Sequence, residues 1–154
     1  MMTLKESIEL VVRKSNRVTI VDKTTGDLVS EIKSVLLENG VSSVTVIDAR
    51  TLYDKNDFRR MLNAIQDGIL IIDHATEVPE SKHRDIINAL IRACLKGDYL
   101  DVTEEWMMHF TETKIGVAAI VDKNDYNAPV FREIFPIGGG CGLLAFTDDG
   151  PECF

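Results

Sequence analysis

Apolar positions along the chain follow two periods, one typical of helices and one typical of buried strands. In four stretches apolar side chains recur every three or four residues with charges between them, which predicts helices over residues 3–15, 24–39, 57–65 and 79–97. Short β-branched or apolar runs separate these stretches and predict strands. The predicted strands are residues 18–21, 44–48, 69–73, 115–121 and 143–147.

Residues that favour helix ends accompany several of these stretches. Thr24 followed by Asp27 fits a capping box, and Asn39-Gly40 suits a left-handed helix end. Pro79 and Gly97 bracket the fourth stretch with proline in the first turn and glycine just past the end. Trp106-Met107-Met108 indicates a short helix within residues 98–113.

The alternation of strands and helices predicts an α/β fold, because parallel strands need crossover connections and these helices supply them. Residues 69–73 are apolar on both faces, as in a sheet covered on both sides. We therefore expect a three-layer α/β/α sandwich of about five mainly parallel strands. All 154 residues form one domain in this prediction. Its parts are an N-terminal helix (1–16), a core (17–147) and a polar tail (148–154).

Charged or polar residues follow almost every predicted strand. In sheets of this class, ligands bind beyond the carboxyl ends of the strands, so these residues are the first candidates for a site. They are Asp22-Lys23, Asp48-Ala49-Arg50, Asp73-His74, Asp122-Lys123-Asn124 and Thr147-Asp148.

The order of these segments resembles the ATPase core of the AAA+ family of P-loop proteins. Gly68-Ile69-Leu70-Ile71-Ile72-Asp73 resembles the Walker B strand, whose aspartate orients Mg²⁺ in that family. Residues 115–121 with Asp122-Lys123-Asn124 resemble the sensor-1 strand, which ends in a polar residue near the γ-phosphate.

Two further segments carry the resemblance. Lys23-Thr24-Thr25-Gly26-Asp27-Leu28-Val29 resembles the end of the Walker A helix, and Asn127-Ala128-Pro129-Val130-Phe131-Arg132 resembles the segment whose arginine reaches a neighbouring subunit. The resemblance covers residues 17–147 and implies a P-loop-like strand order. It makes Asp73 a metal-binding candidate and Lys23, Thr24, Asp122, Asn124 and Arg132 nucleotide-binding candidates. We expect this core without the family's helical lid.

The sequence departs from the family at the two positions that handle ATP. No glycine lies between Arg17 and Lys23, so the phosphate loop is degenerate, and β-branched residues there resist the positive φ such a loop needs. His74 stands where the family has a catalytic glutamate. Asp73 and His74 remain the candidates for catalysis, since a neutral imidazole is able to act as a base near pH 7. We expect no hydrolysis of ATP and no bound Mg²⁺–ATP.

Ordinary structural roles account for the same residues. Lys23-Thr24 also fits a strand-to-helix turn with a threonine cap, and Arg132 also fits a surface pair with Glu133. Gly138-Gly139-Gly140-Cys141-Gly142 precedes a strand, so a flexible connector is favoured over an anion-binding turn. Cys141 as a thiol nucleophile stays an alternative.

Net charge, apolar content and the positions of cysteine and histidine limit the kinds of partner and metal site that the chain is expected to have. The formal charge of −8 disfavours general nucleic-acid binding. Lys5, Arg13, Lys14 and Arg17 are the densest candidate for a local basic cluster, but a solvated helix face is favoured for them. No apolar stretch approaches the about 20 residues of a membrane span, and the N-terminus does not fit a secretory signal, so we expect a cytoplasmic protein. Cys94, Cys141 and Cys153 lack metal-site spacing. His74, His83 and His109 are scattered.

Three functions fit these features. The first, which we favour, is a non-hydrolysing ATPase-like domain that binds a protein partner or its own copies, for example as an accessory factor of a replication or remodelling machine or in a phage or mobile element. The second is a Mg²⁺-dependent phosphoryl-transfer or nucleotide-binding enzyme using Asp22, Asp48, Asp73, His74 and Asp122. The third is an acidic adaptor or inhibitor of a nucleic-acid-handling protein.

Overall fold

One six-stranded sheet runs through the computed structural model, which describes residues 6, 8, 17–65, 67–96, 116–125 and 142–153. Its strands are β1 (Arg17–Lys23), β2 (Val44–Asp48), β3 (Ile69–Asp73), β4 (Gly116–Asp122), β5 (Gly142–Thr147) and β6 (Gly150–Cys153). Their order across the sheet is β2-β3-β4-β1-β5-β6. The five predicted strands are confirmed, each within about one or two residues of its predicted bounds.

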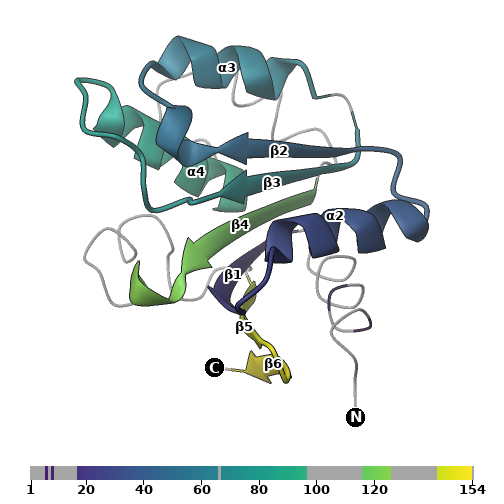
Figure 1. Ribbon diagram of the computed structural model, residues 1–154. Helices are drawn as coiled ribbons and strands as arrows, with labels where there is room; N and C mark the ends of the chain where they lie inside the picture. The colour runs from purple at the N-terminus through teal and green to yellow at the C-terminus, as the bar shows by residue number, and fades with distance from the viewer. Residues whose placement is uncertain are drawn as a thin grey trace.

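Strands β1 to β5 are all parallel to their neighbours. Figure 1 shows the arrowheads of β2, β3 and β4 pointing the same way, so their carboxyl ends share one edge. The order places β1 between β4 and β5, so β1 is an interior strand of the parallel part. This confirms the predicted α/β fold with P-loop-like strand order.

The predicted polar tail instead contains a strand. Gly150–Cys153 forms β6, which pairs antiparallel with β5, and Thr147 lies opposite Gly150. Asp148 and Asp149 make the two-residue turn between the two strands, a length typical of hairpins. The polar composition that suggested a tail therefore belongs to a hairpin turn and an edge strand.

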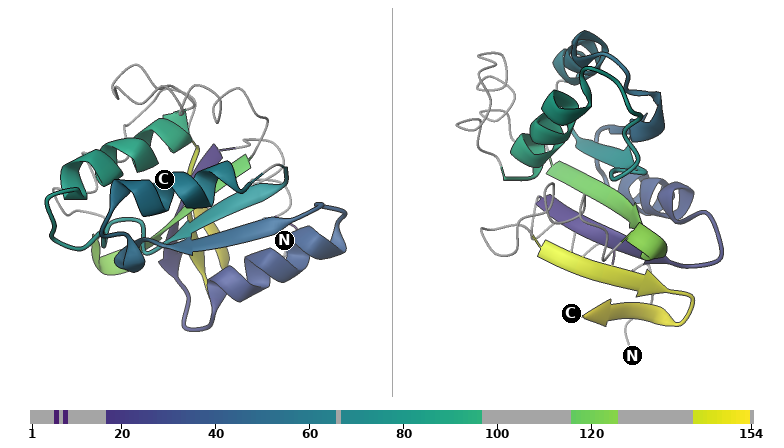
Figure 2. Two further views of the ribbon diagram at one scale, coloured as in Figure 1. Left: turned by 90° about the horizontal axis from the view of Figure 1, so that it is seen from above. Right: turned by 90° about the vertical axis from the view of Figure 1, so that its left-hand side faces the viewer.

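Helices cover both faces of the sheet. The helices are α2 (Leu28–Glu38), α3 (Lys55–Asn63) and α4 (Arg84–Lys96), with single 3₁₀ turns η1 (Ala49–Thr51) and η2 (Lys123–Asp125). One buried cluster joins α2 and Ile8 to one sheet face, and a second joins α3 and α4 to the other. Figure 2 shows this three-layer arrangement from two further directions.

Alternate residues of strand β4 pack against the helices on opposite faces of the sheet. Ala118 and Ile120 belong to the cluster of α2, whereas Val117, Ala119 and Val121 belong to the cluster of α3 and α4. All five side chains are buried, at 3% exposed or less. The uninterrupted apolar run is thus a consequence of two covered faces.

Two predicted helix starts are wrong. Helix α4 begins at Arg84 and not at Pro79. The hydroxyl of Ser81 accepts the backbone N–H of His83, and Nδ1 of His83 accepts the N–H of Lys55, which begins α3. These side-chain bonds hold the segment before Arg84 in a turn, because they compete with helical hydrogen bonding. Helix α2 begins at Leu28, which concerns the site below.

The predicted end of α2 is confirmed. Gly40 has a φ of +88°, the N–H of Val41 donates to the carbonyl of Leu36, and that of Gly40 donates to Leu37. This pair of bonds is the Schellman arrangement that a glycine allows. Of the predicted N-terminal helix, Glu6 and Ile8 are helical and Ile8 is buried. The rest of that helix and the predicted short helix within 98–113 lie outside the described residues. Within the described part, a helix with the length and apolar character of a membrane span does not occur.

Candidate functional site

The parallel register brings the predicted strand-end residues to one edge of the sheet. Asp22 of β1 lies beside Asp122 of β4, and Asp48 of β2 lies beside Asp73 of β3. Lys23 is the last residue of β1 and lies beside Thr147 of β5. The structure therefore places these candidates at neighbouring strand ends, as their sequence positions predict.

The loop between β1 and α2 is held by two carboxylates. Oδ1 of Asp22 accepts the backbone N–H of Thr24 at 2.9 Å and its hydroxyl at 2.6 Å. Asp148, in the turn between β5 and β6, accepts the N–H of Thr25 at 3.0 Å and its hydroxyl at 2.9 Å. These bonds from Thr25 lower the pKa of the Asp148 carboxyl.

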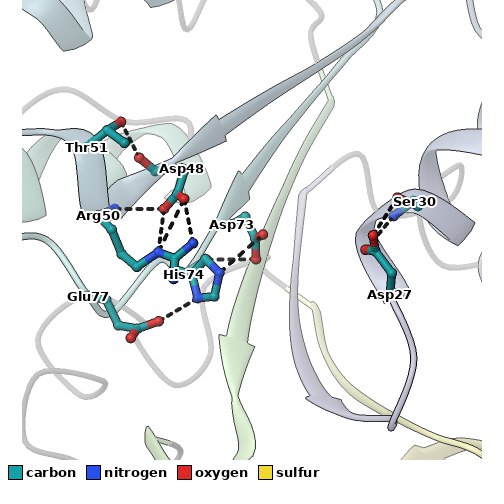
Figure 3. Close-up of polar contacts among 8 residues, drawn as sticks. All are labelled: Asp27, Ser30, Asp48, Arg50, Thr51, Asp73, His74 and Glu77. Atoms are coloured by element: carbon teal, nitrogen blue, oxygen red, sulfur yellow. Dashed lines mark hydrogen bonds and ion pairs between the residues drawn. The ribbon is translucent and has the colours of Figure 1, made fainter.

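A third carboxylate caps α2. Asp27 accepts the N–H of Ser30 at 3.1 Å and the hydroxyl of Ser30 at 2.8 Å, and these bonds lower the pKa of Asp27 (Figure 3). The predicted capping box that began at Thr24 is wrong, because Thr24 is bonded to Asp22 and Asp27 occupies the cap position. Asp148 belongs to the strand-end pair Thr147-Asp148 that the sequence selected, whereas Asp27 was not selected as a site residue. The signal for Asp27 was its placement directly before a helix.

Three N–H groups at this loop and the start of α2 therefore already have anionic partners. In a phosphate loop, successive backbone N–H groups point at the phosphate oxygens. Here the N–H groups of Thr24, Thr25 and Ser30 donate to carboxylates of the chain itself. Gly26 has an ordinary negative φ and nothing within 4 Å of a built Cβ, so no close backbone approach depends on it.

His74 follows β3 in a conformation that is uncommon for its residue type. Its φ is +52°, in the left-handed region. Its N–H donates to Oδ1 of Asp73 at 2.9 Å, its Nδ1 lies 2.6 Å from Oε2 of Glu77, and its Nε2 lies 3.5 Å from Oδ2 of Asp73 (Figure 3). The imidazole is thus held between two carboxylates. Glu77 is a further residue that the sequence prediction did not select.

The pKa values of two neighbouring carboxyls at this edge are shifted in opposite directions. Burial raises the pKa of Asp73, whose side chain is 25% exposed. The guanidinium of Arg50 donates to both oxygens of Asp48, with Nη2 at 2.8 Å, and this bond lowers the pKa of Asp48. Asp48 is therefore already committed to an ion pair within its own strand end (Figure 3).

An open cleft of about 440 Å³ lies between the start of α2 and the end of β3. The described residues that line it include the carboxylates Asp22, Asp27 and Asp73 together with His74, while Leu28 and Val29 supply apolar surface. Lys23 is not among these described lining residues. The cleft thus presents acceptors and negative charge where a P-loop protein presents donors and a lysine.

The remaining candidates lie away from this cleft or outside the described residues. The N–H of Asn124 donates to Oδ1 of Asp122, and both side chains are exposed. Arg132, Cys141 and His109 lie outside the described residues, as does most of the glycine run 138–142. His83 is bonded to the N–H of Lys55. In the part of the chain that the structure describes, no three His, Cys, Asp or Glu side chains form a metal-binding group.

Comparisons with known proteins add no family to this geometry. No protein-family model matches the chain. The search of curated proteins also finds no significant match. The functional conclusion therefore rests on the residues and the fold themselves.

Proposed function

We propose that this chain is a non-hydrolysing domain derived from an AAA+-like ATPase core and that it acts through protein–protein contacts. The observation that carries the proposal is the occupied loop between β1 and α2. A core that keeps the P-loop-like strand order, yet fills its phosphate-binding donors with its own carboxylates, suits binding of a protein better than binding of a nucleotide.

The first argument is the direction of the hydrogen bonds. A triphosphate needs donors, and the N–H groups of Thr24 and Thr25 already donate to Asp22 and Asp148. A phosphate that bound these N–H groups would displace the carboxylates, which would then lose their hydrogen bonds. The hydrogen bonds gained by the phosphate would only replace those lost by the carboxylates.

The second argument is electrostatic. Asp22, Asp27 and Asp73 line the cleft, and Asp148 holds the loop beside it. Phosphate oxygens at this position would face several carboxylates at short range, where like charges repel strongly. The total charge of −8 adds a weaker repulsion of the same sign.

The third argument concerns the chemistry after binding. His74 takes the place of the glutamate that would position the attacking water, and its ring is bonded to Glu77. The alternative of a Mg²⁺-dependent enzyme has less support, because Asp48 is paired with Arg50 and Asp22 with Thr24.

Titration calorimetry with Mg²⁺–ATP tests the proposal. We expect no saturable heat at micromolar nucleotide and no phosphate release above a protein-free control. Micromolar binding accompanied by turnover would overturn the proposal, and loss of that turnover in Asp73→Asn would assign it to this edge. If Asp73→Asn released phosphate as fast as the wild type, the activity would belong to a contaminating enzyme. Further purification should then lower phosphate release to that of the protein-free control.

Hydrogen exchange tests whether the N–H of Thr25 is bonded to Asp148, the observation on which the proposal depends. We expect Asp148→Ala to accelerate exchange at the amide of Thr25, because that N–H loses its acceptor. The amide of Ser30, which donates to Asp27, is the internal control and keeps its rate. If Thr25 exchanges equally fast in the wild type and in Asp148→Ala, the loop amide is free and the main argument fails.

A further inference from the structure

Two neighbouring loops beyond the carboxyl ends of the strands are joined through one histidine. One loop connects β2 to α3 and the other connects β3 to α4, and Figure 1 shows both helices beginning on the same side of the molecule. The hydroxyl of Ser81 donates to the carbonyl of Tyr53 at 3.2 Å, and Nδ1 of His83 accepts the N–H of Lys55 at 3.1 Å. Ser81 also accepts the N–H of His83 at 3.1 Å, so the two contacts form one connected unit.

His83 completes the cap of α3 from outside that helix. The first N–H groups of a helix have no acceptor within it. Asp54 accepts the N–H of Asn56 at 2.8 Å, and Nδ1 of His83 accepts the N–H of Lys55, the first residue of the helix. A ring nitrogen that accepts a hydrogen bond carries no proton, so the imidazole is neutral with its proton on Nε2. The contact between the two loops therefore requires an uncharged histidine.

The same ring nitrogen has a second neighbour that requires the opposite protonation. Oδ1 of Asp54 lies 3.3 Å from Nδ1 of His83. A carboxylate only accepts, so it bonds Nδ1 only when that nitrogen carries a proton. The N–H of Asn56 lowers the pKa of Asp54, so this carboxylate stays charged between pH 5 and 8, where imidazoles titrate. Protonation thus decides whether Nδ1 bonds the donor at 3.1 Å or the acceptor at 3.3 Å.

We propose that His83 is a pH-sensitive clamp between the two loops, closed when the imidazole is neutral and released when it is protonated. A proton on Nδ1 turns that nitrogen into a donor, which breaks its bond with the N–H of Lys55 and allows an ion pair with Asp54. Exchange of partners on protonation is an established way for histidine to act as a switch. The inference goes beyond the proposed function, because it concerns how firmly the loops are held and not what the cleft binds.

The charges around His83 act on the released state in opposite senses. A positive imidazole is attracted by Asp54 and repelled by the N-terminal end of α3, where the helix dipole is positive. The side chain of His83 is 22% exposed, so water screens these interactions only in part. Arg60 pairs with Asp57 within α3, which limits the effect of both on the imidazole. The other ionisable residues of the two segments are Lys55, Glu80, Lys82, Arg84 and Asp85.

Nuclear magnetic resonance of the full chain tests the proposal. At pH 8 we expect long-range proton–nitrogen spectra to show His83 with its proton on Nε2, and at pH 5.5 with protons on both nitrogens. Hydrogen exchange then follows the amide of Lys55. We expect its protection factor to fall about three- to tenfold from pH 7.5 to pH 5.5, since one hydrogen bond is lost. The amide of Ser30, which donates to Asp27, is the internal control and should keep its protection.

His83→Asn is the decisive variant, because its amide oxygen replaces Nδ1 with an acceptor that does not titrate. We expect equal protection of Lys55 at both pH values in this variant. His74→Asn is the matched control, since it removes another imidazole at the same edge, and asparagine tolerates the left-handed φ of +52°. It should keep the full pH response of Lys55.

A proton on Nδ1 of His83 at pH 8 would overturn the inference, as would protection of Lys55 that is the same at both pH values in the wild type. A pH response that persists in His83→Asn would assign the effect to another group and overturn it as well. If His83→Asn does not fold, the tautomer and the exchange of the wild type decide the test. None of these measurements involves a nucleotide, so this inference and the proposed function fail separately.

Discussion

At the scale of single residues, the strand-end carboxyls show how one edge of a sheet gives identical side chains different properties. Asp48 and Asp73 end neighbouring strands in register. Asp48 is bonded to Arg50, which favours its charged form, whereas Asp73 is more buried and its charged form is disfavoured. The carboxyl type is readable from sequence, but the sign of each shift depends on the neighbours that folding supplies.

Substitutions at these two positions should therefore have opposite effects on stability. The raised pKa of Asp73 means that its ionised form destabilises the fold above that pKa, so Asp73→Asn should raise the free energy of unfolding at pH 7. The lowered pKa of Asp48 means that it stabilises the fold above its ordinary value of 3.8, so Asp48→Asn should lower that free energy modestly. Exposed ion pairs contribute about 0–1 kcal/mol.

Urea unfolding between pH 7 and pH 3 measures both effects. As pH falls and the carboxyls become protonated, the gain from Asp73→Asn should shrink and the loss from Asp48→Asn should also shrink. Asparagine keeps an acceptor for the N–H of His74, so Asp73→Asn tests the charge with the turn intact. A destabilised Asp73→Asn at pH 7 would contradict the buried-carboxyl explanation.

At the scale of elements, the junction between β2 and β3 depends on one glycine. Gly68 has a φ of +88°, and a Cβ built on it would lie 2.1 Å from the carbonyl oxygen of Ser43. That carbonyl also accepts the N–H of Ile69, so it is held in place by the sheet. Gly68, directly before β3, thus allows the close approach of the two strands.

Gly68→Ala should lower the free energy of unfolding by about 2–4 kcal/mol, because a left-handed φ disfavours alanine and the new Cβ overlaps backbone atoms. Gly26→Ala is the matched control, since Gly26 has an ordinary φ and open space around it. It should be neutral or stabilising by about 0.4–1 kcal/mol. Thermal and denaturant unfolding compare the two variants. If Gly26→Ala were the more damaging change, the loop between β1 and α2 would have a constraint that its geometry does not account for.

The helix starts show that local sequence patterns alone do not fix where a helix begins. The capping box proposed at Thr24 and the proline start at Pro79 both satisfied local rules. The capping box is wrong because Thr24 donates to Asp22 and Asp27 caps the helix instead. The proline start is wrong where the distant Lys55 donates to His83. The end of α2 was correct, since the bonds of Gly40 and Val41 are made within the helix itself.

At the scale of the whole molecule, net charge predicts what the protein does not bind. The charge of −8 repels phosphate backbones. Of the basic cluster seen in the sequence, Arg17 is described, and its Nε–H donates to the carbonyl of Cys94 at 3.2 Å. This bond gives Arg17 a structural role, while Lys5, Arg13 and Lys14 lie outside the described residues.

We therefore expect no saturable binding of labelled single-stranded or double-stranded oligonucleotides. Fluorescence anisotropy at low salt is the appropriate measurement, because attraction to phosphates is strongest there. A basic DNA-binding domain under the same conditions serves as the positive control. Saturable binding that weakens steeply with added salt would show that a local basic surface outweighs the total charge.

The sequence by itself determined the layers and the five parallel strands of this protein, but not β6. Apolar periodicity depends on neighbours within a few residues, and burial of both faces of a sheet leaves a continuous apolar run that is readable in one dimension. Only the tertiary structure decided what the strand ends do. Whether Thr25 faces an open site or the carboxylate of Asp148 depends on a contact across 123 residues. The hairpin that carries Asp148 likewise exists only because β5 is there to pair with β6.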